Sequence, residues 1–158
     1  MTIPTLIRHL HTAIADPTLG AVVPFTQVWE RHASCCDRIR ERLLEDFHLT
    51  DLAEVCDRHL VLFEFVERTM GISPVLVPAP VIDVQRSLAA AIDRTTSPEE
   101  LVALIRDSPH FARTLHTRVR ETGGTNLQPL MLALSMLEHD QDALVHLVDV
   151  FTPAGEHA

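Results

Sequence analysis

The chain has 158 residues, a formal net charge of −9, 46% hydrophobic residues and no lysine among its thirteen basic residues. This length suits one domain with a sizeable core, and an aromatic share of only 4% leaves aliphatic side chains to fill that core, as in helix packing. The acidic balance disfavours nucleic acid and anionic membranes as partners, and the absence of lysine excludes a lysine Schiff base or a P-loop lysine.

The cysteine pattern and the apolar runs indicate the expected compartment and whether the chain associates with a membrane. Three cysteines, two of them adjacent at Cys35 and Cys36, do not form a disulfide framework, so we expect a reducing, cytoplasmic environment. Residues 1–16 contain Pro4 and Arg8 where a signal peptide needs an unbroken apolar run. The longest apolar candidate, residues 60–66, is too short to span a bilayer. We therefore expect no membrane association.

The first half of the chain predicts three helices. Apolar residues recur at helical spacing over residues 3–15, and Asp16-Pro17 ends the pattern. A second helix is predicted from about Pro24 to Phe47, with apolar and charged residues on opposite faces. After a break at residues 48–50, a third helix runs to Met70 and ends at Gly71.

Residues 72–80 read ISPVLVPAP, and three prolines forbid a helix there. This segment is therefore predicted to be extended, with its Val and Leu side chains packed across the bundle. Within a single domain of residues 1–158, it is also the expected seam between two sub-units of the fold. A helix over residues 81–94 follows it, and residues 152–158 are expected to fray.

The second half of the chain predicts four shorter helices that form two stacked helical hairpins. Ser97-Pro98 and Ser108-Pro109 each resemble the start of a helix, and Gly123-Gly124 breaks the chain between the two predicted pairs. The predicted helices cover residues 98–106, 109–121, 126–138 and 140–151. The fold class predicted from the whole sequence is all-α, a helical bundle of about seven to eight helices.

Two histidines and two cysteines stand on apolar faces of the second and third predicted helices. If the break is centred near His48, residues whose numbers sum to about 96 face each other, which places Cys36 level with His59. His32 lies one helical turn from Cys36, and Cys56 lies one turn from His59 on the far side. The register therefore brings His32, Cys36 and His59 together and leaves Cys56 one turn away.

Three interpretations of these residues remain open at the level of sequence. His32, Cys36, His59 and Cys56 are candidate ligands for zinc or another transition metal, with the first three best placed to share one ion. The pattern favours a packed core over a metal site, because cysteine behaves as a small hydrophobe. Two histidines in an apolar seam also suit a proton-sensing element, since protonation would destabilise the seam.

Two weaker patterns occur in the second half of the chain. Four residues on one helical stripe near the end, His139, Asp142, His146 and Asp149, have metal-binding chemistry but fit a solvated helix face better. Residues 97–121 resemble a helix-turn-helix whose second helix carries Arg113, Arg118 and Arg120. The acidic charge of the chain argues against DNA binding, so these arginines are expected to meet acidic groups of a partner or of the same chain.

The sequence contains none of the common enzyme motifs, such as GxSxG, HExxH or a P-loop. The function expected first is therefore a small interaction, adaptor or regulatory module that contacts a protein partner or a second copy of itself. The alternative is a metal-binding or redox- or pH-sensing helical bundle. A DNA-binding regulator is the third interpretation.

Overall fold

The computed structural model describes residues 1–17, 20–70, 75–122 and 127–152, and these residues form six helices and two short strands. The described elements, in chain order, are α1 (Ile3–Ala15), β1 (Val22–Pro24), α2 (Phe25–Glu45), α3 (Thr50–Met70), β2 (Leu76–Pro78), α4 (Pro80–Arg94), α5 (Pro98–Thr122) and α6 (Gln128–Phe151). The all-α prediction is confirmed, apart from the small sheet. No helix in these ranges is both long enough and apolar enough to cross a membrane.

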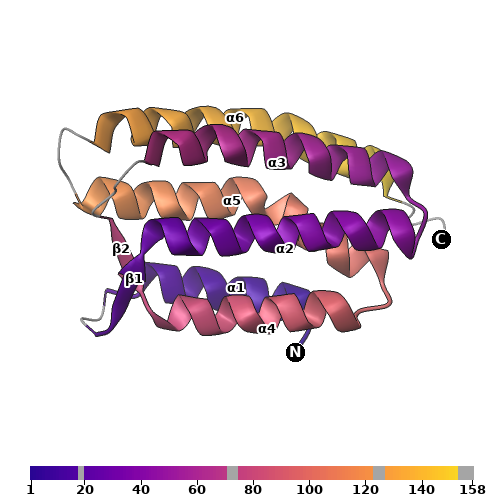
Figure 1. Cartoon of the computed structure of the whole chain (residues 1–158), viewed down its shortest axis with the longest axis horizontal. Coiled ribbons are helices and arrows are strands. Elements are labelled where there is room, and N and C mark those ends of the chain that lie inside the picture. The colour runs from indigo at the N-terminus through magenta and orange to yellow at the C-terminus, as the bar shows by residue number, and fades with distance from the viewer. Residues whose placement is uncertain (18–19, 71–74, 123–126, 153–158) are drawn as a thin grey trace.

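The six helices lie roughly parallel or antiparallel in three layers of two (Figure 1). Helices α3 and α6 form one outer layer, α1 and α4 form the other, and α2 and α5 lie between them. The central pair contacts both outer layers, since α2 packs on α3 and α4 while α5 packs on α6 and α1. Side chains buried from both halves of the chain belong to one continuous hydrophobic cluster.

The turn between α2 and α3 fixes the register of these two helices. His48 adopts a left-handed conformation with φ of 53°, and the Leu49 amide donates to the Leu43 carbonyl at 2.8 Å. This arrangement satisfies carbonyls at the end of α2 and starts the next helix at once. Trp29 and Phe63 stack across the hairpin with ring centroids 4.2 Å apart. A break between the two helices is thus present as predicted, but it covers residues 46–49 and not 48–50.

The proline-rich segment is extended over residues 75–78, as predicted, but Pro80 begins α4 instead of belonging to the extended segment. Val75 and Val77 pack on the bundle with no exposed surface, whereas Leu76, also predicted to pack, is 45% exposed. Strand β2 pairs with β1 in an antiparallel register that sets Val23 opposite Val77, a pairing the sequence analysis did not anticipate. Residues 72–74 lie outside the described residues, as do Gly71 and residues 153–158 of the expected tail. The sub-unit seam and the domain boundaries remain predictions.

The predicted pair of stacked hairpins in the second half is wrong, because the structure has one hairpin of two long helices. Helix α5 continues through Pro109, although proline lacks the amide hydrogen that would bond to Ile105. The ribbon of α5 changes direction partway along in Figure 1, as proline kinks do. Burial of Phe111 and Leu115 on the same core as Leu104 offsets the loss.

Helix α6 likewise runs without interruption through residues 138–140, where the sequence analysis placed a break. That stretch is polar but contains neither glycine nor proline, so nothing in it stops a helix. Leu137, Gln141 and Leu144 are all buried on one face, which keeps the helix packed across the polar stretch. The helix count over the described residues is therefore six, below the seven to eight expected.

Candidate functional site

His32, Cys36 and His59 meet in the middle of the bundle. His32 and Cys36 come from successive turns of α2, and His59 comes from α3. One donor atom from each residue lies within 4.8 Å of the other two, and each residue is at most 1% exposed. Within the described ranges they are the one group of His, Cys and acidic residues close enough to share an ion. We call them the His-Cys-His cluster.

Cys56, the fourth candidate ligand, is buried but is not part of this group. It precedes His59 by three residues on α3, so it lies about 4.5 Å further along the helix axis. The register argument from the sequence therefore gives the same three residues as the geometry.

His32 is held between aromatic rings. Its ring stacks on Phe111 with centroids 3.7 Å apart and planes 9° apart, and it lies 5.3 Å from the Phe63 ring. Its Nε2 atom is buried and has no hydrogen-bond partner. Burial, together with the neighbouring His59 and His11, holds the pKa of His32 well below its usual value. The ring is therefore neutral and its Nε2 is unsatisfied.

His59 has hydrogen-bond partners on both ring nitrogens. Its Nε2 lies 3.0 Å from the Ser108 hydroxyl, and its Nδ1 lies 3.1 Å from the Gln141 amide nitrogen. Ser108 donates its own hydrogen to the Leu104 carbonyl, so it accepts from His59 Nε2–H, and Gln141 donates to Nδ1. This pairing assigns the neutral Nε2–H tautomer. Burial lowers the pKa of His59 to about 3.

Ser108 and Gln141 are site residues that the sequence analysis missed. Because Ser108 precedes Pro109, the sequence suggested that it starts a helix. In the structure it lies inside α5 and is fully buried. Gln141 is a polar residue on the apolar face of α6, between Leu137 and Leu144. This pattern could have identified it as a site residue from the sequence. The contact of Ser108 with His59 does not make a nucleophile, because no substrate reaches a serine with no exposed surface.

The three cysteines are free, buried thiols. Burial raises the pKa of Cys36 well above its usual value, that of Cys56 to about 12 and that of Cys35 to about 11. Reactive cysteines need an exposed thiolate stabilised by positive charge. These thiols are protonated in the metal-free protein, and their burial does not favour the redox-sensing interpretation.

The cluster has the donors of a three-ligand metal site but no carboxylate. Both imidazoles are neutral, as ligation requires, while Cys36 must lose its proton to bind a metal. His32 Nε2 is a donor atom with nothing else to bind. His59 must release either Ser108 or Gln141 from one of its nitrogens before that nitrogen can ligate. Gln141 can pair with either tautomer, because an amide both donates and accepts.

The stripe on α6 is a solvated face. His139, Asp142, His146 and Asp149 are all exposed. Asp149 already accepts from Arg106 at 2.9 Å, and the four do not form a metal-sized group. The geometry therefore fits a solvated helix face and not a metal site.

The helix-turn-helix that the sequence of residues 97–121 resembles is not formed. Those residues belong to the single helix α5, so no turn separates a recognition helix. Arg113 donates to Glu138 of α6 at 3.0 Å, and Arg118 contacts Glu121 at 3.7 Å. As expected, these arginines meet acidic groups of the same chain.

The chain was compared with known families, curated proteins and solved structures, and no family model, curated protein or solved structure matches it. Its function is therefore argued from the geometry of the site alone.

Proposed function

We propose that the protein binds a thiophilic transition-metal ion through His32, Cys36 and His59. The supporting observation is the convergence of two imidazoles and one thiol within 4.8 Å of one another in an otherwise apolar core. An unsatisfied buried polar atom such as His32 Nε2 costs about 1–3 kcal/mol. A metal bound to this nitrogen would remove that cost.

The charge balance favours Cu(I) over Zn(II). One thiolate and two neutral imidazoles cancel the charge of a monovalent ion but leave a divalent ion with a net positive charge. An uncompensated charge is costly in a buried site. Zinc also prefers a fourth ligand, and the described residues supply none beyond the three. Soft thiolate ligands suit Cu(I).

The free thiols fit a protein that works in a reducing compartment, such as the cytoplasm. A buried three-ligand site with no exposed thiol fits metal storage, delivery or sensing better than catalysis. We therefore propose that the regulatory role expected from the sequence depends on whether the metal is bound.

The test is metal binding by protein purified without a histidine tag, with two cysteine variants as a matched pair. Cys36→Ala removes the proposed sulfur ligand, and Cys56→Ala removes an equally buried sulfur one turn from His59. Cu(I) affinity is measured by competition with a coloured chelator, and Zn(II) is titrated in parallel. We expect wild type and Cys56→Ala to bind one Cu(I) and Cys36→Ala to lose that binding. Equal binding by all three proteins would exclude the cluster as the site.

A groove between α2 and α3 supports a second candidate function, the interaction module. Its floor contains Ala33, Leu60 and Phe63, and Val61 at its edge is 63% exposed. Its rim carries five acidic residues and no basic ones: Glu30, Asp37, Asp57, Glu64 and Glu67. In the described part of the chain only Asp57 of these five forms a salt bridge, with Arg40.

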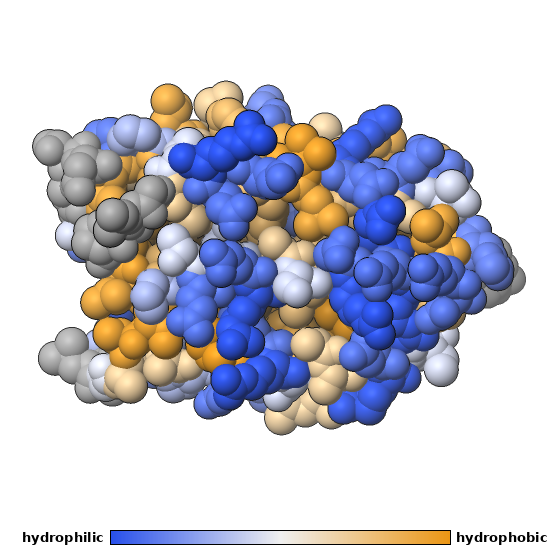
Figure 2. Space-filling model, in the orientation of Figure 1, coloured by the Kyte–Doolittle hydropathy of each residue, from blue (hydrophilic) through white to orange (hydrophobic). Residues whose placement is uncertain are grey.

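An apolar floor with an acidic rim fits a basic amphipathic helix as the docked partner. A second copy of this chain is a poorer occupant, because its own net charge is −9. On the face shown in Figure 2, hydrophilic residues predominate and hydrophobic residues appear in separate groups. The charge on the rim is therefore the main feature that would select the partner.

Trp29 lines the groove but has no exposed surface, so binding is measured by the fluorescence anisotropy of a labelled peptide. The probe is a synthetic twelve-residue peptide of leucine and lysine with helical amphipathic spacing. The triple variant Glu30→Gln, Glu64→Gln, Glu67→Gln is compared with Glu45→Gln, Glu54→Gln, Glu99→Gln, which removes equal charge elsewhere. We expect the first to weaken binding about tenfold and the second to change it little. Equal weakening would show non-specific attraction and contradict the proposal.

A further inference from the structure

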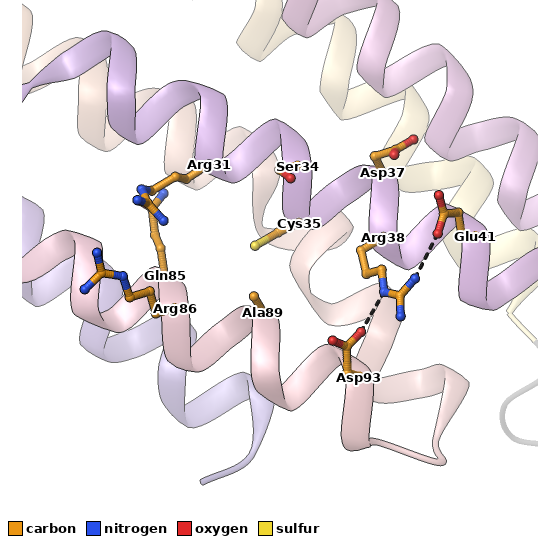
Figure 3. Close-up of a pocket in the computed structure, with 10 residues that line it drawn as sticks. All are labelled: Arg31, Ser34, Cys35, Asp37, Arg38, Glu41, Gln85, Arg86, Ala89 and Asp93. Carbon is orange, nitrogen blue, oxygen red and sulfur yellow. Dashed lines mark hydrogen bonds and ion pairs between the residues drawn. The ribbon is translucent and has the colours of Figure 1, made fainter.

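A second site lies on the opposite side of α2, between α2 and α4 (Figure 3). It is a pocket with a volume of about 500 Å³, a size that suits a small-molecule ligand. Arg31 and Cys35 lie on the face of α2 that is turned toward α4. Each directly precedes a residue of the His-Cys-His cluster, His32 and Cys36, which lies on a different face of the helix. The pocket is therefore separate from the His-Cys-His cluster and is tested separately.

The pocket contains two buried polar atoms that lack partners. Gln85 is 2% exposed, and its amide nitrogen donates to the Val28 carbonyl at 2.9 Å, but its Oε1 has no partner. Arg31 Nε is also buried and unpartnered. One of these atoms is an acceptor and the other a donor. Buried polar atoms are nearly always satisfied, so this pair points to a ligand that carries both a donor and an acceptor.

The charges in the pocket are divided between its two ends. Arg31 and Arg86 lie at one end with the Gln85 side chain between them in Figure 3. Among the described residues, Arg31 has no ion pair, and Arg86 has only a 3.5 Å contact with Asp83, whose side chain is 79% exposed. The first end is therefore cationic in a chain that is acidic overall.

The other end of the pocket is acidic, because Asp37, Glu41 and Asp93 outnumber the single Arg38 there. Arg38 donates to Asp93 at 2.6 Å and to Glu41 at 3.0 Å. Asp37 also lines this end, without a salt bridge in the described ranges. An anion is thus attracted to the Arg31 end and not to the Arg38 end. This difference sets the orientation of a bound anionic ligand in the pocket.

We propose that this pocket binds a small hydroxylated organic anion, with its phosphate or carboxylate between Arg31 and Arg86 and a hydroxyl group donating to Gln85 Oε1. Guanidinium groups bind such oxyanions with strong, charge-assisted hydrogen bonds. Neighbouring atoms cover Gln85 Oε1, so the Gln85 side chain must turn toward the pocket for the hydroxyl to reach it. Inorganic phosphate and a simple acid lack a hydroxyl placed to make this contact.

The probes are glycerol 3-phosphate, glycerate, inorganic phosphate and glycerol, each titrated calorimetrically against the full chain at low salt. We expect one of the two hydroxylated anions to bind about three- to tenfold more tightly than inorganic phosphate, because of the added hydrogen bond. Glycerol should not bind measurably. The comparison of glycerol 3-phosphate with glycerate tells which oxyanion the pocket accepts.

Arg31→Gln should weaken the binding about tenfold or more, since it removes one charge-assisted contact. Arg86→Gln is a second variant at an exposed position, which keeps the test valid if Arg31→Gln disturbs the fold. Arg58→Gln is the control, because it removes equal charge from an exposed position on α3. Failure of every anion to bind, or equal losses in Arg31→Gln and Arg58→Gln, would overturn the proposal.

Discussion

The ring of His32 lies flat against the ring of Phe111, with centroids 3.7 Å and planes 9° apart, while its Nε2 has no hydrogen-bond partner. The stacking alone needs only an aromatic ring, and phenylalanine would supply one without an unsatisfied nitrogen. The nitrogen is therefore a cost to the metal-free fold. A ligand bound to this nitrogen would offset that cost.

His32→Phe should therefore raise the free energy of unfolding of the metal-free protein by about 1 kcal/mol, while it abolishes metal binding. Urea denaturation in the presence of a strong chelator measures the first effect, and the chelator competition measures the second. A loss of stability of more than about 2 kcal/mol would show instead that the imidazole nitrogen contributes to the fold itself.

Gln141→Met should lower the free energy of unfolding by about 1–3 kcal/mol, because it leaves His59 Nδ1 buried without its donor. Methionine keeps much of the volume and flexibility of glutamine. Gln128→Met serves as the control, since Gln128 is exposed at the start of the same helix and should change stability by less than about 0.5 kcal/mol. Similar effects of the two substitutions would argue against the hydrogen bond.

The stability of the metal-free protein should fall as the pH falls from about 6.5 toward 3. The folded-state pKa of His59 is lowered to about 3, while the unfolded chain titrates near its usual value of about 6.5. Between these values the unfolded state binds more protons, so acid favours unfolding.

The expected loss from His59 between pH 7 and pH 5 is about 2 kcal/mol, and His32 adds to it in the same direction. Urea denaturation at both pH values measures the change. His59→Gln should reduce it, whereas His146→Gln, at an exposed position, should leave it unchanged. A pH dependence that His59→Gln does not alter would assign the acid sensitivity to other groups.

The thiols of the native protein should resist modification at pH 8. Burial raises the pKa of all three, and for Cys35 and Cys56 it outweighs the opposite effect of Arg31 and Arg40. With an aromatic disulfide reagent we expect slow, unfolding-limited reaction of the native protein and rapid reaction of all three thiols in denaturant. Cys35, at 5% exposure, should react first. Immediate modification of Cys36 would contradict its placement in the core.

The part of the site that the sequence predicted lies within one helical hairpin. The break at His48 and the 3.6-residue period fix which residues of α2 and α3 face each other, so Cys36 and His59 are paired by local rules. Ser108 and Gln141 come from α5 and α6, far along the chain. Their contacts with His59 depend on long-range packing, which a single sequence does not encode in a readable pattern.

The errors in the second half have the same origin. Pro109 is a strong local sign of a helix boundary, but burial of Phe111 and its neighbours outweighs the lost hydrogen bond. The small sheet was missed because β1 and β2 have three residues each, too few to show an alternating pattern. At Pro109, therefore, tertiary packing overrides the local preference of the chain.

X-ray absorption at the metal edge of the Cu(I)-loaded protein tests the central claim most directly, because it counts the ligand types around the ion. The account predicts one sulfur at about 2.2–2.3 Å and two imidazole nitrogens at about 2.0 Å, unchanged in Cys56→Ala and without the sulfur in Cys36→Ala. A spectrum with two or more sulfurs, with none, or with a sulfur that persists in Cys36→Ala would contradict it.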